Sequence, residues 1–473
     1  MKQLFISLSL FFLCLASSAQ SVTGDWYGLL TVPGAQLPLI MHITKTDAGY
    51  AATLDSPDQK SMGIPMDNVS FADNKLVVGF TAAAMTYTGT FLPDSSKING
   101  TFKQGPGSFP LVLTREKPAV KAETKPEDKV RPQDPKDFPY VQEEVQFTNP
   151  KAGDQLSGTL TMPANRKASK IVILISGSGP QDRNEEIPQF NHRPFLVWSD
   201  WLTRNGIAVL RYDDRGTAKS TGDFQAATTA DFADDAEAAV NYIKSRADLK
   251  GLSIGLLGHS EGGMIAPMVA SRNNNVKFIV LLAGPGIPIA KLMVQQMEDI
   301  SRSAGAADSV TKGAVNGNAK IYALMNSNKE LPAAALKIKL DSLLHDQFNT
   351  YRKAELGTLP IDQMVTSSSA TVLKPWFRYF LGFNPSDYLV KVKCPTLALN
   401  GTNDLQVKCE PNLDAIKIAL TKAGNKNFKM VPLPGLNHMF QKIVTGSVAE
   451  YSQLTETINP VALTTVSSWI KQL

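Results

Sequence analysis

A short glycine-rich stretch, Gly258 to Gly263, constrains this chain more than any other part of its sequence. The apolar run 252–257 before it predicts a strand, and the apolar run 264–271 after it predicts a helix. Ser260 is therefore predicted to lie in a sharp turn between a strand and a helix, the arrangement called a nucleophile elbow. So tight a turn leaves no room for side chains two residues before and after the serine, and glycine occupies both positions.

A second match to the same spacing lies just upstream, at Gly251, Ser253 and Gly255. Ser253 falls inside the predicted strand, where no turn lifts its hydroxyl out of the sheet. Ser260 is therefore the candidate nucleophile, and the question is whether the rest of the chain supplies the groups that a nucleophilic serine needs.

The first residues predict an exported protein. Lys2 precedes an apolar run that ends in small residues at Ala19, and this pattern is typical of a signal peptide over residues 1–19. The run is shorter than the roughly 20 residues that cross a bilayer. We therefore expect a periplasmic or secreted protein, cleaved after about Ala19, without stable membrane insertion.

The remaining chain of this 473-residue protein divides by composition and periodicity. Residues 20–115 form short alternating runs between turn residues, which predicts an antiparallel β-domain of barrel or sandwich type. These runs span 25–31, 37–46, 50–54, 75–80, 85–92 and 109–114. Residues 116–137 are rich in Lys, Glu, Asp and Pro, and such a composition predicts a linker.

Strands and helices alternate over residues 138–473, which predicts an α/β domain with a mostly parallel sheet and crossover helices. Helical periodicity without any strand breaks this rhythm at about 287–390. Because the preceding strand ends at the same edge of the sheet as the elbow, we expect this insertion to be a helical lid over a substrate pocket.

Composition excludes several classes of function. The net charge is only +5, and no Lys/Arg block with interleaved aromatic residues is present, so we expect no nucleic-acid partner. No His, Cys or Asp cluster has metal-ligand spacing, and no glycine-rich dinucleotide fingerprint follows a strand. We therefore expect neither a metal nor a cofactor.

A serine hydroxyl needs a base beside it and a carboxylate that holds the base in the right tautomer. In a fold with this elbow the order along the chain is serine, acid, histidine. Asp404 follows the predicted strand 396–400, and the carboxyl end of a parallel strand is where catalytic groups collect. His438 follows the predicted strand 429–432 and is the only histidine after this acid. Ser260, Asp404 and His438 are the predicted triad.

Two other carboxylates are close to Asp404 in the sequence. Asp387 precedes the predicted strand and belongs to the opposite end of the sheet, whereas Glu410 lies in the following helix. Asp404 is therefore the preferred acid.

A tetrahedral intermediate needs two preorganised N–H donors. The backbone of Glu261, directly after the nucleophile, is the first candidate. The second comes from the loop 176–183 after the first long buried strand, whose glycines let the backbone approach the substrate closely, and we assign it to the Ser178 N–H. A phosphate-binding loop is the alternative, but its G-x-x-x-x-G-K-S/T spacing is absent. The Glu261 side chain is expected to be structural, and Asp214 and Arg215 are expected to form an ion pair at the rim of the site.

Five motifs of the second domain occur together in a known family. They are Ser-Gly-Ser-Gly-Pro-Gln-Asp-Arg at 176–183, Tyr-Asp-Asp-Arg-Gly at 212–216, Gly-His-Ser-Glu-Gly-Gly at 258–263, Asn-Gly-Thr-Asn-Asp-Leu-Gln-Val at 400–407 and Asn-His-Met-Phe at 437–440. As a set they resemble bacterial α/β-hydrolases of the EstD-type esterase and serine-aminopeptidase-like group, over residues 140–473. The sequence after Gly216 departs from relatives that carry a second glycine there.

The resemblance implies an α/β-hydrolase fold with a β-rich domain ahead of it. It also implies a carboxylesterase that cleaves short-chain acyl esters, small-molecule substrates, through an acyl-enzyme. Ser260, Asp404 and His438 match the family's triad.

An exported serine peptidase that removes N-terminal residues is the main alternative, since one fold serves both reactions. Such an enzyme needs an acidic pocket for the ammonium group of its substrate. The lid offers Glu298, Asp299, Asp341 and Asp346.

A binding protein with an inert hydrolase fold is the other alternative. Its β-domain would hold glycans or cell-surface material through Trp26 and Tyr27. An aromatic pair in a strand is more often part of a core, so this alternative rests on whether the two rings are exposed.

Overall fold

The computed structural model describes residues 21–32, 35–47, 49–57, 61–80, 85–104, 107–117, 131–352, 361–444 and 447–473. The predicted signal peptide, 1–19, and residues 118–130 of the predicted linker lie outside these ranges. The chain divides into two compact units. The first comprises residues 1–122 with 351–364, and the second comprises residues 123–350 with 365–473.

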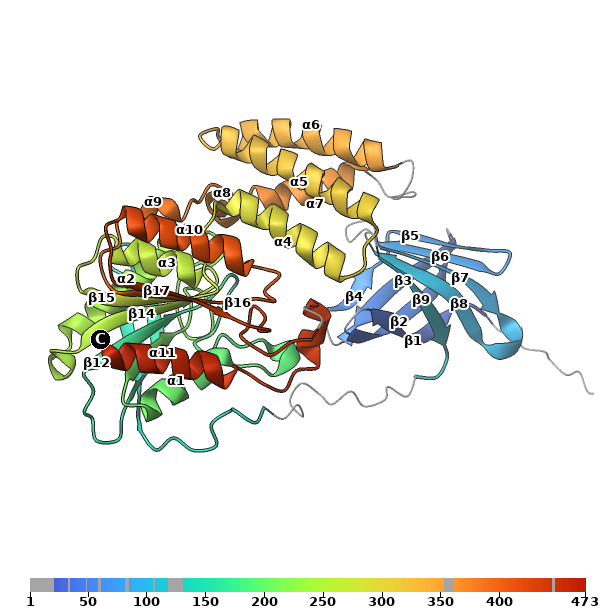
Figure 1. Ribbon diagram of the computed structural model, residues 1–473. Helices are drawn as coiled ribbons and strands as arrows, with labels where there is room; N and C mark the ends of the chain where they lie inside the picture. Colours follow the sequence, from blue (N-terminus) through green and yellow to red (C-terminus); the bar gives the residue numbers. More distant parts are fainter. Residues whose placement is uncertain are drawn as a thin grey trace, which may run out of the picture. The chain divides into compact units, whose positions relative to one another are not determined.

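The first unit contains one antiparallel sheet in the order β4-β3-β2-β1-β9-β8-β7-β6-β5 (Figure 1). Its strands are β1 (Gly24–Val32), β2 (Ala35–Thr46), β3 (Gly49–Ser56), β4 (Ser61–Pro65), β5 (Asn68–Ala72), β6 (Lys75–Phe80), β7 (Met85–Leu92), β8 (Lys97–Gln104) and β9 (Gly107–Thr114). The pairing of β1 with β9 joins the two halves of the sheet. The predicted antiparallel β-domain is confirmed, although β4, β5 and β8 were not among the predicted runs.

Trp26 belongs to the core of this sheet. Its ring is fully buried, and its indole N–H donates to the main-chain carbonyl of Val22 at 2.6 Å. The Arg115 guanidinium lies over the ring at 3.8 Å from its centre. The Trp26 ring is therefore unavailable to an external ligand, which removes half of the aromatic pair on which the binding-protein alternative rests.

The second unit is built on a sheet in the order β10-β11-β13-β12-β14-β15-β16-β17. The strands are β10 (Val141–Thr148), β11 (Gln155–Met162), β12 (Lys170–Ile175), β13 (Ala208–Tyr212), β14 (Ser253–His259), β15 (Val276–Leu282), β16 (Thr396–Gly401) and β17 (Phe428–Leu433). The pairs β10–β11 and β11–β13 are antiparallel, and every other pair is parallel. The predicted mostly parallel sheet is confirmed.

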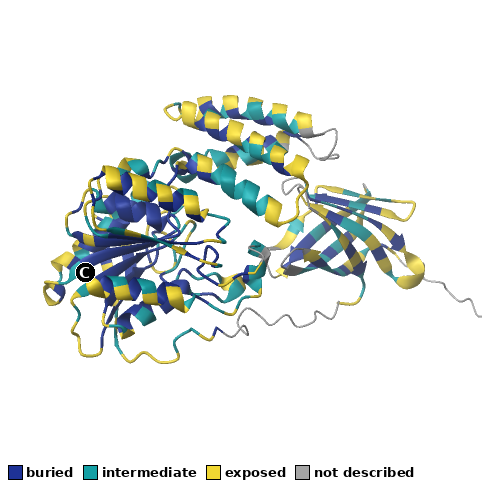
Figure 2. Ribbon diagram, in the orientation of Figure 1, coloured by how far each residue is buried: buried dark blue, intermediate teal, exposed yellow. Residues whose placement is uncertain are grey.

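Helices cover both faces of this sheet (Figure 1). They are α1 (Pro194–Arg204), α2 (Thr229–Ser245), α3 (Gly262–Ala270), α10 (Cys409–Lys422) and α11 (Pro460–Gln472). One apolar core joins the sheet to α2, α3 and α10, and a second core joins its other face to α1 and α11. The central strands are consequently buried on both sides (Figure 2), as expected for parallel strands between helices.

The predicted helical insertion lies between β15 and β16. Its helices are α4 (Ile289–Ser303), α5 (Asp308–Ser327), α6 (Ala333–Arg352), α7 (Ile361–Val372), α8 (Pro375–Leu381) and α9 (Ser386–Leu389). All regular elements of the described residues in this insertion are helices, as the periodicity predicted. Among the helices that the structure describes, none is long and apolar enough to cross a bilayer.

Residues 131–137, which the sequence assigned to the linker, pack on the second unit. Arg131 is only 5% exposed and donates to the main-chain carbonyls of Phe190 and Leu454, each at 2.6 Å. The Gln133 side chain donates to the Ile458 carbonyl and accepts the Ile458 N–H. The second unit thus begins before residue 138, because these contacts are made by polar side chains that leave no apolar pattern in the sequence.

Replacement of Arg131 tests this anchoring. Arg131→Ala removes the donor of several partly buried carbonyls, and we expect the free energy of unfolding to fall by about 1–3 kcal/mol. Urea denaturation measures this loss. Lys136→Ala, an exposed change in the same segment, is the control and should change the stability by less than about 0.5 kcal/mol. Equal stabilities of the two variants would show that the segment is not an anchor.

Candidate active site

Ser260 lies at the turn between β14 and α3 with a φ angle of +52°, which non-glycine residues rarely adopt. The two glycines around it make this turn sterically feasible. A Cβ on Gly258 would lie 1.9 Å from the Gly262 carbonyl oxygen, and a Cβ on Gly262 would lie 2.1 Å from the Ile175 oxygen. Ser253, the second match to the motif, is the first residue of β14 and therefore lies at the opposite end of that strand.

The predicted acid and base lie next to each other. Asp404 is in the loop after β16, and its Oδ2 is 2.8 Å from Nδ1 of His438, in the loop after β17. The His438 and Asp404 side chains are 5% and 0% exposed. Asp404 Oδ1 accepts the N–H groups of Gln406 and Val407 at 2.8 and 2.9 Å, which fixes the orientation of the carboxylate.

The competing carboxylates lie elsewhere. Asp387 is in the short helix α9, where Asn384 donates to it, and Glu410 is exposed in the first turn of α10. The carboxylate that is hydrogen-bonded to His438 is that of Asp404, so the preference for Asp404 agrees with the geometry.

Ser260 and His438 line one cavity of about 430 Å³. Ser178 and Glu261, the predicted oxyanion donors, line it as well, and Asp404 lies behind His438. Much of the remaining wall is apolar, with contributions from the lid helices α4 and α8. The apolar residues include Ile187, Phe190, Leu292, Trp376, Phe380 and Met439. The structure therefore brings four of the predicted site residues to one cavity, with the fifth directly behind.

The loop after β12 lies directly against Ser260, the candidate nucleophile. A Cβ on Gly177 would be 3.3 Å from the Ser260 Cβ, and the Gly177 N–H donates to Glu185 Oε1 at 2.7 Å. Ser178, the next residue, faces the cavity. Because Glu185 already accepts the Gly177 N–H, Ser178 remains the candidate oxyanion donor of this loop.

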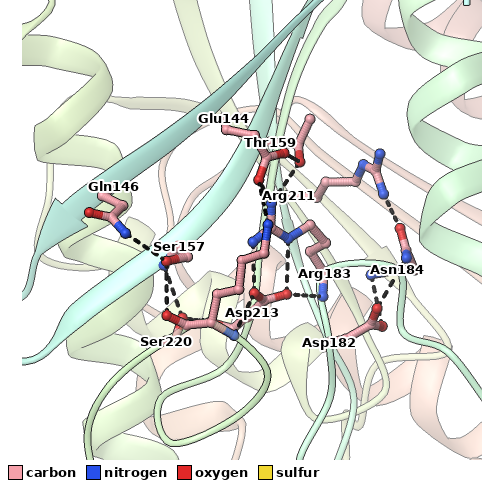
Figure 3. A network of polar contacts seen from close by, with 11 residues as sticks. Glu144, Gln146, Ser157, Thr159, Asp182, Arg183, Asn184, Arg211, Asp213 and Ser220 are labelled. Atoms are coloured by element: carbon pink, nitrogen blue, oxygen red, sulfur yellow. Dashed lines mark hydrogen bonds and ion pairs between the residues drawn. The ribbon is translucent and has the colours of Figure 1, made fainter.

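A buried ion pair anchors the same loop to the end of β13 (Figure 3). Arg183 donates to both oxygens of Asp213, at 3.0 and 2.7 Å, and its main-chain N–H adds a third bond to that carboxylate. The other guanidinium nitrogen reaches Glu144 and Thr159 on β10 and β11. A loop without regular structure is thereby fixed by charged hydrogen bonds.

Asp214 has a different role from the one predicted. It accepts the Ser176 hydroxyl at 2.8 Å and the Gln181 N–H at 3.0 Å, and burial raises its pKa well above the usual value. Arg215 pairs with Asp235 on α2 at 2.6 Å, so the expected Asp214–Arg215 ion pair is wrong. The chain turns at this point, where the Thr217 N–H donates to the Asp214 carbonyl at 3.0 Å, and the two side chains find separate partners.

The Glu261 side chain connects the elbow to the lid. It is fully buried and accepts the Thr229 hydroxyl at 2.6 Å and the indole N–H of Trp376, on α8, at 2.9 Å. Burial raises its pKa, and a hydrogen bond from Ser178 opposes that shift. Trp376 in turn stacks on Phe380, with ring centres 4.7 Å apart. The sequence predicted a structural side chain here but had no signal for its partner on the lid.

The lid carboxylates do not line the cavity. Glu298 pairs with Arg302, Asp299 with Lys408, and Asp341 with Lys337. Asp346 likewise does not line the cavity among the residues that the structure describes. In the described part of the chain, no three His, Cys, Asp or Glu side chains are grouped as metal ligands.

Comparison with known proteins finds similar sequences for the second unit. The family described as Serine aminopeptidase, S33, matches residues 195–348. Esterase EstD from Thermotoga maritima is 25% identical over 290 residues, which cover 60% of this chain and 58% of EstD. The second unit is thus similar in sequence to EstD and to the serine aminopeptidase S33 family. An uncharacterized Escherichia coli protein, YfhR, is 29% identical to the chain over 142 residues, or 29% of this chain and 43% of YfhR. The chain thus spans about half the length of these curated relatives.

Solved structures resemble this α/β-hydrolase at low sequence identity. An esterase from Pyrococcus furiosus has a TM-score of 0.43 and 18% identity, covering 72% of this chain and 93% of its own. Est1E from Butyrivibrio proteoclasticus, with ferulic acid bound, has a TM-score of 0.39 and 18% identity, covering 69% of this chain and 98% of its own. Similarity at this level gives no information about the substrate of this α/β-hydrolase.

The elbow glycines give a direct test of the packing around Ser260. Gly262→Ala forces a methyl group against the Ile175 carbonyl, and we expect the free energy of unfolding to fall by at least about 1–3 kcal/mol. Gly382→Ala is the control, because its Cβ would meet no atom closer than 3.6 Å. Denaturant unfolding measures both, and an unchanged stability of Gly262→Ala would contradict the close approach.

Proposed function

We propose that the α/β-hydrolase unit is a serine hydrolase that cleaves carboxylic esters of short, neutral acyl groups. The observation that carries this proposal is the buried pair of His438 Nδ1 and Asp404 Oδ2, 2.8 Å apart, in a cavity that Ser260 also lines. A carboxylate on Nδ1 selects the tautomer in which Nε2 can accept the proton of a serine hydroxyl.

The reaction follows from these positions. His438 Nε2 takes the Ser260 proton while the hydroxyl oxygen attacks the ester carbonyl. The resulting oxyanion accepts hydrogen bonds from the backbone N–H groups of Ser178 and Glu261. The intermediate collapses as His438 returns the proton to the departing alcohol, which leaves an acyl group on Ser260. Water, activated by the same histidine, then hydrolyses this acyl-enzyme.

The cavity wall supports a neutral acyl group. No Lys or Arg lines the described cavity, so a carboxylate on the acyl chain would find no partner there. Its two carboxylates, Glu185 and Glu261, already accept hydrogen bonds from protein groups. The aromatic and aliphatic side chains of the wall suit an apolar acyl chain, and the volume of about 430 Å³ limits its size.

Substitution of the two motif serines tests the nucleophile. Ser260→Ala should lower kcat on short-chain nitrophenyl esters by about 10⁴-fold or more, whereas Ser253→Ala, the matched control, should retain turnover. Labelling with a fluorophosphonate should likewise disappear only in Ser260→Ala. A fully active Ser260→Ala protein would refute the mechanism.

The same assay separates esterase from peptidase. Nitrophenyl esters and aminoacyl amides of matched size are compared on the purified enzyme, and we expect ester hydrolysis to dominate. A preference for substrates with a free amino group would instead favour the aminopeptidase alternative, which the description of the matching family also suggests.

We also propose that the protein is exported, periplasmic or secreted. The support is the basic start, apolar run and small-residue site of residues 1–19. Expression with the native leader in a bacterial host, followed by N-terminal sequencing of the extracytoplasmic protein, should yield a chain that begins after about Ala19. Retention of an uncleaved chain in the cytoplasm would contradict export.

A further inference from the structure

A second buried histidine lies next to Ser260 in the chain and against the backbone of His438. His259, the last residue of β14, directly precedes Ser260 and is 6% exposed. Its Nδ1 is 2.8 Å from Glu185 Oε1, and its Nε2 is 3.1 Å from the main-chain oxygen of His438. Both ring nitrogens therefore face oxygen atoms that accept hydrogen bonds.

These two contacts define the protonation of the ring. A neutral imidazole has one N–H and can donate to only one oxygen, whereas an imidazolium donates to both. The His438 carbonyl can only accept. Glu185 Oε1 accepts the Gly177 N–H as well, at 2.7 Å, and its negative charge complements a cationic ring. An ion pair of His259 and Glu185 satisfies all three contacts.

We propose that His259 and Glu185 form a positioning pair that holds the nucleophile turn, the oxyanion loop and the base loop together, and that the pair holds them only while His259 carries both ring protons. This inference rests on the proposed serine-hydrolase function. Neither residue is assigned a chemical step, because both act through their neighbours.

The pair connects three strand ends through short contacts. His259 is bonded covalently to Ser260 at the end of β14, and Glu185 holds Gly177, next to Ser178, after β12. On the other side, His259 holds the backbone of His438 after β17, with the two imidazole centres 4.9 Å apart. A shift of the pair would therefore move the nucleophile, an oxyanion donor and the base relative to one another.

Several titratable groups act on His259. Burial lowers its pKa, while Glu185, the His438 carbonyl and the more distant Asp404 raise it, and the net pKa lies above the ordinary 6.5. The nearby His192 has a pKa lowered by burial to about 4 and is neutral at working pH. His438 must itself be neutral to act as base. Of these three histidines, His259 is therefore the cation in the active state.

A pH dependence follows with a definite sign. The imidazolium of His259 is present below its ordinary pKa and is lost as the pH rises through the raised pKa. The neutral ring then loses one of its two hydrogen bonds. Because activity needs a protonated His259, kcat should fall as the pH rises through the raised pKa of His259.

Two substitutions test the pair. Glu185→Gln keeps the shape but removes the charge, which lowers the pKa of His259, so the alkaline fall in kcat should move to lower pH. At pH 8 we expect kcat to drop about 10- to 100-fold with KM within about two-fold. His259→Gln keeps an N–H donor near the His438 carbonyl but cannot titrate, so the alkaline fall should disappear from its profile.

Asp235→Asn provides the matched control. It removes the charge of another buried carboxylate, paired with Arg215 at 2.6 Å, and Asp235 does not line the cavity of about 430 Å³. We expect this variant to lose stability in urea denaturation while it keeps the wild-type pH profile. Loss of a buried ion pair alone would then not explain the shifts seen in Glu185→Gln.

A measurement that needs no turnover tests the inference even if the Glu185 and His259 variants do not fold. The ¹⁵N chemical shifts of the imidazole nitrogens in Ser260→Ala should show His259 doubly protonated at pH 7. A singly protonated His259 at this pH would overturn the inference, as would an unchanged alkaline limb in His259→Gln. Wild-type protein that neither cleaves esters nor reacts with a fluorophosphonate would instead refute the proposed function, whatever the NMR result.

Discussion

The contact between main-chain atoms around Ser260 is the constraint on which the rest of the second unit depends. The turn brings the backbone of Gly262 against Ile175 at the end of β12, so close that no Cβ fits between them. The serine adopts a φ angle of +52° as a result, and a strained residue of this kind persists only where its surroundings hold it in place. The neighbouring strands and α3 supply that support, because their apolar side chains fill the core next to the turn. The stability of the fold is thereby used to hold the half-buried Ser260 in an unusual backbone conformation.

Buried carboxylates organise the loops around this turn. Asp213 fixes Arg183, Asp214 fixes Ser176 and Gln181, and Glu185 fixes Gly177, so three acids determine the shape of the loop after β12. Asp404 and Glu261 do the same for the base and for the lid helix α8. Burying a charge is expensive unless it is paired and hydrogen-bonded. These carboxylates accept hydrogen bonds from backbone N–H groups and from side chains, so loops without regular structure become as well defined as the strands that carry them.

Much of this arrangement can be predicted from the sequence, and the failures have physical reasons. The strands β14, β16 and β17 lie within two residues of the predicted strands 252–257, 396–400 and 429–432, because apolar runs bounded by turn residues are a local signal. The strands β4, β5 and β8 contain polar or charged residues and a weak alternation, so their pairing partners decide their structure. The expected Asp214–Arg215 pair is wrong because adjacent side chains diverge, and each residue finds a partner far away in the chain. Arg131 and Gln133 pack through polar contacts, which leave no periodic trace.

The sequence by itself determined the elbow, the candidates for acid and base, and the α/β character of the second unit. These features depend on local steric limits, on the order of residues along the chain and on hydrophobic periodicity, all of which can be read from one sequence. Only the tertiary structure decided that His259 and Glu185 meet at 2.8 Å, that Glu261 bonds Trp376 on the lid, and that the lid acids stay outside the cavity. Such contacts join residues far apart in the chain, and a buried hydrogen bond between them depends on positions set by the whole sheet. The Gly258–Gly263 stretch specifies a turn, and the fold around it determines which groups surround the serine.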